Sequence, residues 1–335
     1  MDVIMAFKDV LGHGKPIHML QRAIKTDKVV HSYLFLGNEG IGKKRVALQF
    51  SKALNCLEGG PETGEACDHC LSCKKIERGL HPDVVLLEPE NQTIKVDQVR
   101  QMQRHLAYRP YEGRRRVCII AAADRMAPNM SNILLKTLEE PPLHTVIILL
   151  ANNPRLLLPT ILSRCQAVRF NPLPISLVTQ WLVEQKGLST GEAHLVASLS
   201  EGSPGKALDL QEEMGEIPRG DLLKGWLGLT SLSFEAMEHW TESLPSDRER
   251  LISILEVAKT LLRDLVIIKT VHDRSKLIHS DLQEKMESIA AQWDLPALLN
   301  RIDVLHQTIL DVSPIRGNAN TKLALEAMML SWAEG

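Results

Sequence analysis

A glycine-rich segment follows the first apolar run of the chain and has the spacing of a phosphate-binding loop. The run Tyr33–Leu36 is followed by G-N-E-G-I-G-K-K. In the pattern G-x-x-x-x-G-K-[ST], glycines let backbone N–H groups surround phosphate oxygens, the lysine neutralises them and the hydroxyl holds magnesium. The candidate phosphate-contacting residues are Gly37, Gly40, Gly42 and Lys43. Lys44 stands where the hydroxyl is required, and an ammonium group repels magnesium, so the sequence leaves nucleotide occupancy of this loop open.

The acidic residues of a nucleotide-hydrolysing site are missing as well. In P-loop ATPases a second strand ends in acidic residues, of which the first helps to hold magnesium and the next polarises the attacking water. The corresponding strand here is Val117–Ile120, and it is followed by Ala121 and Ala122. Asp124 comes later and suits the capping of a turn. Because the magnesium hydroxyl, the magnesium carboxylate and the catalytic glutamate are all absent, we expect no intrinsic ATPase activity.

Four cysteines have a spacing typical of a zinc site. Cys56, Cys67, Cys70 and Cys73 follow the pattern C-x10-C-x2-C-x2-C. Close C-x2-C pairs direct thiolates to one tetrahedral centre at about 2.3 Å. Four thiolates complete the coordination shell, so the predicted zinc is structural. The alternative is a set of scattered structural cysteines, and His69, between two of the ligands, is interpreted as a bystander.

An arginine near the end of the alternating strand and helix pattern is the remaining candidate for chemistry. Arg164 lies in L-P-T-I-L-S-R-C, residues 158–165. In a site without catalytic residues this arginine has no chemical partner of its own. Two interpretations stay open. The first is a structural salt bridge, and the second is an arginine finger that stabilises charge on a phosphoryl group in a neighbouring subunit.

The apolar content and the charge are ordinary for a soluble globular protein. The chain has 335 residues, enough for two or three domains of about 100–200 residues each. The net charge of −2 gives no overall basic character, so any DNA contact requires a local patch. We interpret Arg114, Arg115 and Arg116 as a solvated turn, with contact to DNA or to a partner as the alternative. We find no signal-peptide pattern and no long apolar run, and we therefore expect a cytoplasmic protein without membrane contact.

Apolar periodicity predicts the elements that position these residues. Strands are expected at 33–36, 84–87, 117–120, 145–150 and 168–170, and helices at 16–26, 43–54, 96–106, 132–138 and 156–162. This alternation indicates an α/β domain with a mainly parallel sheet covered on both faces. After Phe170 the pattern is helical. The last predicted helix, Thr321–Ala333, carries Leu323, Ala327 and Leu330 on one face.

Longer segments resemble bacterial clamp-loader subunits of the AAA+ family, and the resemblance covers nearly the whole chain. Besides the four cysteines, the segments are H-S-Y-L-F-L-G at 31–37, H-P-D at 81–83, N-I-L-L-K-T-L-E-E-P-P at 132–142, L-P-T-I-L-S-R-C at 158–165, G-S-P-G-K-A-L at 202–208, L-L-R-D-L at 261–265 and N-x-N-x-K-L-A-L-E at 318–326. The resemblance implies a P-loop AAA+ domain with a RecA-like parallel sheet at 1–170, into which a zinc module at 56–73 is inserted. It further implies an all-α lid at 171–212 and an all-α collar at 213–335 that holds a ring of subunits together.

The departures from the family pattern indicate which kind of subunit this is. Its ATP-hydrolysing gamma/tau members have an intact G-K-[ST], a D-E pair and an arginine just after G-S-x. This chain has Lys44, Ala121-Ala122 and Gly205 there. The resemblance therefore implies a non-hydrolysing subunit of the replicative polymerase holoenzyme, with Arg164 acting in trans. An ATP-hydrolysing gamma/tau-like subunit is the alternative.

The same resemblance implies the partners and cofactors. The partners are gamma/tau and delta subunits in a five-subunit ring, the sliding clamp, and primer-template DNA through the assembled complex. The cofactor of this chain is the structural zinc, and ATP is bound by the partner subunits.

Overall fold

The computed structural model describes residues 7–89, 94, 96–126, 128–214, 219–223, 244–271, 273–313 and 320–334. Contacts along the chain separate two units. The first consists of Met1–Leu173 with Ser203–Gly205, and the second of Pro174–Gly202 with Lys206–Gly335. Each unit is described by itself. The predicted division of residues 171–335 into a lid and a collar stays a prediction.

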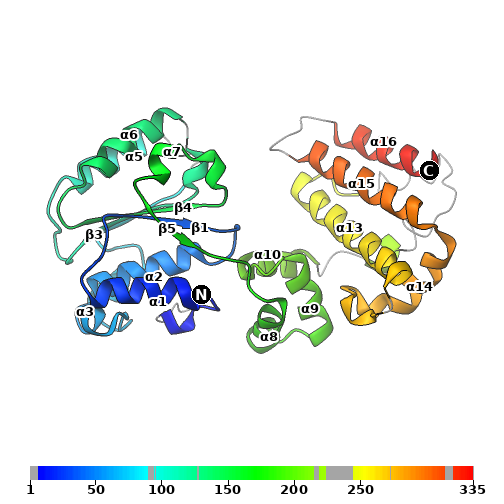
Figure 1. The fold of residues 1–335 in the computed structure, drawn as a ribbon, viewed down its shortest axis with the longest axis horizontal. Coiled ribbons are helices and arrows are strands. Elements are labelled where there is room, and N and C mark those ends of the chain that lie inside the picture. The colour runs from blue at the N-terminus through cyan, green and yellow to red at the C-terminus, as the bar shows by residue number, and fades with distance from the viewer. Residues whose placement is uncertain are drawn as a thin grey trace. The chain divides into compact units, whose positions relative to one another are not determined.

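A five-stranded sheet of parallel strands lies at the centre of the first unit (Figure 1). Its strands, in the order β2-β3-β4-β1-β5, are β1 Ser32–Leu36, β2 Val84–Leu87, β3 Arg116–Ile120, β4 Thr145–Ala151 and β5 Gln166–Arg169. The parallel α/β class predicted from the alternating pattern is confirmed. Because β1 pairs with both β4 and β5, the loop that follows β1 leaves from the carboxyl edge of the sheet, between two neighbouring strands.

Helices cover both faces of this sheet. Figure 1 shows α1 and α2 on one face and α5, α6 and α7 on the other. Their bounds are α1 Gly14–Lys25, α2 Lys43–Asn55, α5 Val96–Leu106, α6 Pro128–Glu139 and α7 Pro159–Leu162. The apolar face of α2 is buried. The centroid of its Phe50 ring lies 5.2 Å from that of the Tyr33 ring in β1. In α5 the expected face of Val99, Met102 and Leu106 is buried against the opposite side of the sheet.

The predicted helix at 156–162 is in fact two shorter elements. A 3-10 turn, Pro154–Leu156, is followed by α7, Pro159–Leu162. Leu158 between them is extended, with φ −62° and ψ 137°. The pyrrolidine ring of a proline disfavours helical geometry at the preceding residue, so Pro159 separates the two turns.

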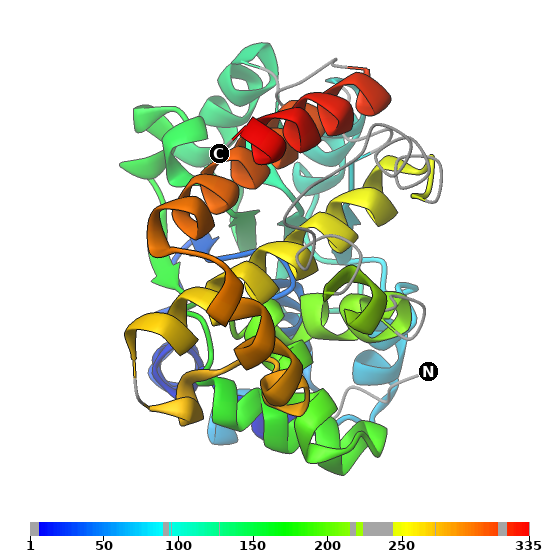
Figure 2. The same ribbon diagram turned by 90° about the vertical axis from the view of Figure 1, so that its right-hand side faces the viewer.

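The described part of the chain after β5 has no strand, and its regular elements are helices. They are α8 Ile175–Lys186, α9 Thr190–Leu199, α10 Pro204–Met214, α11 Arg219–Leu222, α13 Arg248–Thr270, α14 Gln283–Gln292, α15 Leu295–Val312 and α16 Thr321–Glu334. Figures 1 and 2 show α13, α15 and α16 side by side in the second unit. Among the described residues, no helix combines the length and the apolar content needed to cross a membrane.

A buried arginine connects α15 with the end of α16. Arg301 is 3 % exposed, and its guanidinium carbon lies 3.6 Å from the centroid of the Trp293 ring. The same guanidinium donates a hydrogen bond of 3.2 Å to the backbone oxygen of Trp332. Burial lowers the pKa of Arg301 to about 10, which still leaves it charged at neutral pH. The indole face and the carbonyl end of α16 stabilise this cation, so the contact keeps α16 aligned on α15.

Candidate functional site

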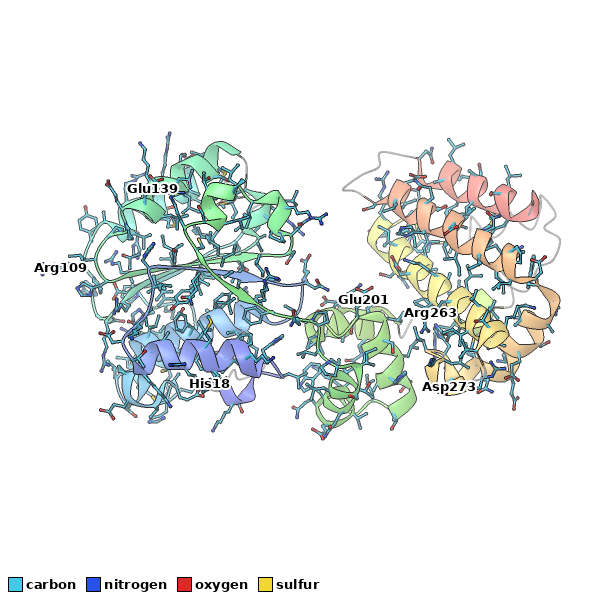
Figure 3. The ribbon with its side chains drawn as sticks, in the orientation of Figure 1. His18, Arg109, Glu139, Glu201, Arg263 and Asp273 are labelled. Atoms are coloured by element: carbon cyan, nitrogen blue, oxygen red, sulfur yellow. The ribbon has the colours of Figure 1, made fainter. Side chains whose placement is uncertain are left out.

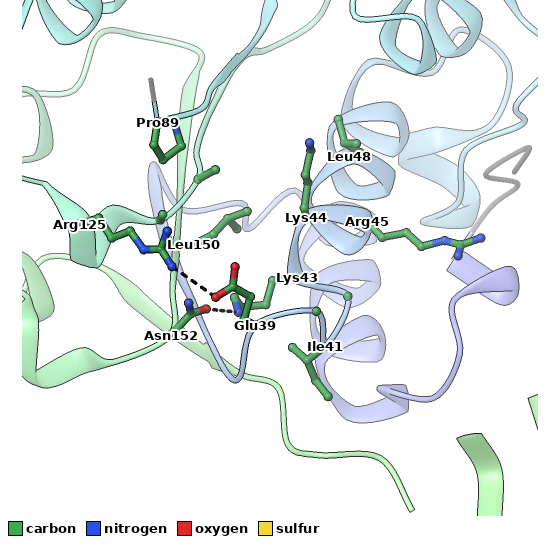
Figure 4. Close-up of a pocket in the computed structure, with 14 residues that line it drawn as sticks. Glu39, Ile41, Lys43, Lys44, Arg45, Leu48, Pro89, Arg125, Leu150 and Asn152 are labelled. Atoms are coloured by element: carbon green, nitrogen blue, oxygen red, sulfur yellow. Dashed lines mark hydrogen bonds and ion pairs between the residues drawn. The ribbon is translucent and has the colours of Figure 1, made fainter. Parts of the chain in front are cut away.

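The phosphate loop has the expected position, between β1 and the N-terminus of α2, but its lysine is bonded within the chain. The Lys43 ammonium donates to the backbone oxygens of Gly37 and Asn38, at 2.6 and 2.7 Å. It also donates to Oδ1 of Asn152 at 2.8 Å, from the segment after β4 (Figure 4). An ammonium group has three N–H donors. All three are therefore used before any phosphate arrives.

Burial also changes the acidity of this lysine. Lys43 is 8 % exposed, and desolvation lowers its pKa to about 8, an effect that the negative charges of Asp124 and Glu39 partly oppose. Glu39, in the loop itself, pairs with Arg125 at 3.3 Å (Figure 4). The loop thus contains an anion, Glu39, that acts on the lysine that would bind phosphate, and the counter-cation of Glu39 comes from the segment after β3.

Lys44, which replaces the magnesium-binding hydroxyl, pairs with Glu88 at 2.6 Å. Both side chains are about half exposed. Lys44 borders a cavity of about 530 Å³ that also reaches Ala121, Ala122 and Arg125. A magnesium ion here would find an ammonium in place of a hydroxyl and methyl groups in place of carboxylates. Hard divalent cations require oxygen ligands, so the described residues do not form a magnesium site.

Asp124 has a structural role that agrees with its predicted capping of a turn. Its Oδ2 accepts hydrogen bonds of 2.9 Å from the backbone N–H groups of Asn152 and Asn153. The carboxylate thereby holds the segment after β4, which presents the Asn152 side chain to Lys43. Sequence reasoning missed Asn152, because a single asparagine after a strand carries no distinctive pattern.

A segment that is distant in the sequence, residues 203–205, is hydrogen-bonded to the phosphate loop. Ser203 Oγ donates to the backbone oxygen of Glu39 at 2.7 Å, and the Gly205 N–H donates to the Gly40 oxygen at 2.8 Å. A Cβ atom at Gly205 would lie 2.8 Å from the Gly40 backbone, closer than real contacts allow. Gly205 is the position where the resemblance to ATP-hydrolysing relatives would require an arginine. With the loop in this conformation, only glycine fits there.

The four predicted zinc ligands come together at the far end of α2. Cys56 directly follows α2, Cys67 lies in a loop, and Cys70 caps the short helix α4, Leu71–Glu77, which also contains Cys73. Their sulfur atoms all lie within 4.8 Å of one another. Backbone N–H groups of the last three cysteines point at the sulfur of the preceding one, at 3.3 to 3.5 Å. Such donors stabilise negative sulfur, and four thiolates at these separations suit a tetrahedral zinc.

The negative charge of the Cys56 sulfur is stabilised by hydrogen bonds from the backbone. Burial alone would raise the pKa of Cys56, but N–H groups of Glu58, Cys67 and Gly59 together lower it to about 6. His69 lies outside the group of four. Its Nδ1 is 2.7 Å from the Cys67 oxygen, and its Nε2 pairs with Glu58, so its role as a bystander stays a prediction.

Ion pairs attach this cysteine module to α2. Lys52 of α2 is buried and pairs with Asp68 at 3.0 Å and with Glu77 of α4. A short helix that the sequence did not predict, α3, Gly60–Thr63, lies between Cys56 and Cys67. One helix therefore carries the phosphate loop at its N-terminus and the cysteine module at its C-terminus.

Arg164 lies between α7 and β5 and is not among the described residues that line the phosphate-loop cavity. Its side chain is 35 % exposed and pairs with Glu139, the last residue of α6, at 2.8 Å (Glu139 is labelled in Figure 3). The guanidinium also donates to the Thr160 oxygen at 3.0 Å, and the Arg164 backbone oxygen accepts a bond of 2.7 Å from Ser32. The salt bridge of the first interpretation exists. It does not decide whether the residue also acts in trans.

Comparisons with known proteins agree with this architecture. The family described as DNA polymerase III, delta subunit, matches residues 12–174, and the family described as DNA polymerase III, delta subunit, C terminal, matches residues 236–334. The chain is 32 % identical to DNA polymerase III subunit delta′ of Bacillus subtilis over 326 residues, which is 95 % of each chain. It is 31 % identical to subunit delta′ of Pseudomonas aeruginosa, over 90 % of this chain and 92 % of that protein.

A second group of relatives carries a different name. The tau subunit of Bacillus subtilis is 28 % identical over 90 % of this chain and 57 % of that protein. Among solved structures, a gamma subunit-related protein of Thermotoga maritima is 20 % identical, with a TM-score of 0.40 over 95 % of this chain and 99 % of that chain.

The first prediction concerns the metal. Purified protein should contain about one zinc per chain. A Cys67→Ser, Cys70→Ser variant should lose it and unfold at a lower temperature, because a closed thiolate site contributes directly to folding. Cys165→Ser, which changes a cysteine outside the cluster, is the matched control and should keep the metal. Full metal content in the double variant would show that the assignment is wrong.

The second prediction concerns hydrolysis by the isolated chain. No magnesium-dependent ATPase should be measurable, and Lys43→Ala should not alter the background rate. Lys44→Thr should stay inactive too, because it restores the hydroxyl but neither carboxylate. Turnover that disappears in Lys43→Ala would overturn this expectation. Weak nucleotide binding without turnover would not, because the loop N–H groups can still contact phosphate.

Proposed function

The chain belongs to the family of DNA polymerase III delta′ subunits, and we propose that it is a clamp-loader subunit that does not itself hydrolyse ATP. The observation that carries the proposal is the Lys43 ammonium, whose three donors are bonded to Gly37, Asn38 and Asn152. A phosphate would have to displace all three acceptors. It would then meet no magnesium, since Lys44 and two alanines occupy the metal-binding positions.

The ATP-hydrolysing gamma/tau-like alternative is supported by the similarity to tau subunits. Three separate features speak against it: the lysine at 44, the alanines at 121 and 122, and the glycine at 205. The last is the most restrictive, because an arginine side chain at 205 would collide with the Gly40 backbone. Regaining hydrolysis would therefore require a different loop conformation as well as different residues.

For Arg164 we propose a role in a neighbouring ATP site. The side chain is partly exposed, outside the cavity of its own unit, and carries a permanent charge with fork geometry that suits phosphoryl oxygens. Its pairing with Glu139 is a surface ion pair, and such pairs contribute only about 0–1 kcal/mol. That is too little to hold the guanidinium against a phosphate with several negative charges, so the arginine can move from the carboxylate to the nucleotide.

For the second unit we propose that α16 contributes to the collar of the ring. One face of this helix buries Leu325, Met328 and Trp332, whereas Leu323 and Leu330 on the other face are 64 % and 52 % exposed. Ala327 lies between these two leucines and is also exposed. A helix that is apolar on both faces is typical of one buried on both sides. The sequence predicted this stripe of 323, 327 and 330, and the structure leaves it open to solvent.

The remaining elements of the proposal follow from membership of a clamp-loader ring. ATP is bound by gamma/tau subunits, and the delta subunit completes the five-subunit ring. The ring opens the sliding clamp and closes it around primer-template DNA in the cytoplasm. Within it, this chain supplies Arg164 to one ATP site, and its zinc keeps the module at 56–73 attached to α2.

The third prediction tests the trans role of Arg164. In a reconstituted complex with gamma/tau and delta subunits, Arg164→Ala should reduce DNA- and clamp-stimulated ATPase and reduce clamp loading further. An arginine finger contributes ~10³–10⁵ in rate at the site that it enters, but only one of several sites faces this subunit, so the loss of total ATPase is partial. Assembly and zinc content should not change.

Two further variants control this measurement. Arg164→Lys should not restore full loading, because an ammonium lacks the planar fork of the guanidinium. Glu139→Gln removes the partner of Arg164 within the chain and should leave loading within about twofold of the parent, as expected of a weak surface pair. If the Arg164→Ala complex loads clamps at the parental rate, Arg164 has only a structural role.

The fourth prediction tests the exposed face of α16. Burial of one leucine contributes about 1.5–3 kcal/mol, so Leu323→Asp, Leu330→Asp should weaken incorporation into the ring at least about 100-fold. Co-purification with the gamma/tau and delta subunits is the measurement. Thermal unfolding of the isolated chain should barely change, because both side chains are exposed. Leu80→Asp, Leu143→Asp is the matched control, because it changes two leucines of the first unit that are 70 % and 78 % exposed. Normal incorporation of the α16 variant would exclude this face from the ring contacts.

A further inference from the structure

The loop between α5 and β3, residues 107–115, displays aromatic side chains that the fold itself does not use. Tyr108 is 71 % exposed and Tyr111 is 82 % exposed. The chain has only three tyrosines, and the third, Tyr33, is completely buried. An aromatic ring in the core contributes strongly to stability. Two rings that stay in water on one short loop therefore suggest contact with another molecule.

Two buried side chains hold the second half of this loop, residues 111–115, in place. The Asp83 carboxylate, which is 0 % exposed, accepts the backbone N–H groups of 111, 112 and 113 at 2.7 to 2.8 Å. Oδ1 of Asn55, at the end of α2, accepts those of 114 and 115 at 2.8 and 2.9 Å. Gly113 is needed for this approach, since a Cβ there would lie 2.6 Å from Oδ1 of Asn55. Five consecutive N–H groups are thus anchored, so Tyr111 and Arg114 are presented on a preorganised backbone.

The free charge of the loop is positive. Arg115 pairs with Asp27 at 3.1 Å, and Arg116, just beyond the loop, lies 3.4 Å from the buried Asp83. The only acidic side chain in the loop, Glu112, is paired with Lys75. Among the described residues, neither Arg109 nor Arg114 has an ion-pair partner, and both are exposed. Figure 3 shows Arg109 at the outer edge of its unit, directed into solvent.

We propose that Tyr108, Arg109, Tyr111 and Arg114 form a binding surface for single-stranded nucleic acid. Aromatic rings stack on bases without regard to sequence, and arginines between them contact the phosphates. An unpaired strand offers both groups at once, whereas bases in a duplex are already stacked on each other. The loop belongs to the first unit alone and needs no neighbouring subunit, so the inference does not depend on the proposed function.

The experiment measures binding of a fluorescent oligothymidylate of about 15 nucleotides by anisotropy, with the zinc-loaded full chain at low salt. Stacking contributes roughly 5- to 150-fold in affinity per base. Tyr108→Ala, Tyr111→Ala should therefore weaken binding at least about 25-fold, whereas Tyr108→Phe, Tyr111→Phe should retain it, because stacking needs the ring and not the hydroxyl. Unchanged thermal unfolding and zinc content are expected for both variants, since the rings are exposed.

The arginines are tested by their dependence on salt. Arg109→Ala, Arg114→Ala should reduce the slope of log affinity against log salt concentration by about 1.4, the value for two lost contacts to single-strand phosphates. Lys186→Ala, Lys285→Ala removes two exposed charges from the second unit and is the matched control. It should leave affinity and slope unchanged.

Three kinds of result would overturn the proposal. The first is that the parent chain does not bind oligothymidylate, or that neither the Tyr108→Ala, Tyr111→Ala variant nor the Arg109→Ala, Arg114→Ala variant changes its binding. The second is equal affinity for an abasic strand of the same length, which offers phosphates without bases. The third is equally effective competition by polyglutamate or by duplex DNA, which would indicate an acidic protein segment or a general attraction of anions.

Discussion

The structure of the first unit depends on one buried ammonium group. Lys43 begins α2, and its three donors join the phosphate loop to itself and to the segment after β4 through Asn152. That segment is held in turn by Asp124, and the loop is held from its other side by Ser203 and Gly205. A lysine buried without acceptors would be strongly destabilising, so these contacts are a condition of the fold as well as a substitute for phosphate. These contacts hold the phosphate loop in its conformation, because the buried ammonium is bonded to acceptors within the chain.

Helix α2 connects the phosphate loop with the loop before β3 and with the cysteine module. Its first residue holds the phosphate loop, and Asn55 at its other end holds the loop before β3. The cysteine module follows directly, and Lys52 joins it to the helix through Asp68 and Glu77. A zinc ion bound by the four cysteines would therefore also fix the end of α2, which Cys56 directly follows. The positions of the two loops are coupled through a rigid helix with a completely buried apolar face.

The second unit is built in a different way. Long helices bury apolar residues on one another, and Arg301 aligns α15 with α16 by stacking on Trp293 and by capping a carbonyl of Trp332. The outer face of α16 nevertheless stays apolar. Both Arg164 and this helix face are accessible on the surface of their own units. The backbone oxygen of Arg164 accepts a hydrogen bond from Ser32 of β1, so the sheet holds the backbone of this residue in place.

The sequence by itself determined the parallel α/β class, the four cysteines and the loss of magnesium ligands at Lys44, Ala121 and Ala122, because strand alternation, ligand spacing and residue type are local properties. The same is true of the apolar stripe on α16, whose spacing is helical. Only the tertiary structure decided that Lys43 is satisfied by Asn152, that Gly205 lies against Gly40, and that Arg164 pairs with Glu139. These partners are far apart in the chain, and no pattern of neighbouring residues encodes their distance. The short helices around the cysteines and the break before Pro159 were missed because few residues define them and the surrounding contacts outweigh local propensity. The Arg114–Arg116 triplet was interpreted as one solvated turn, but burial and acidic neighbours divide it: Arg115 and Arg116 are paired, and Arg114 is free among the described residues.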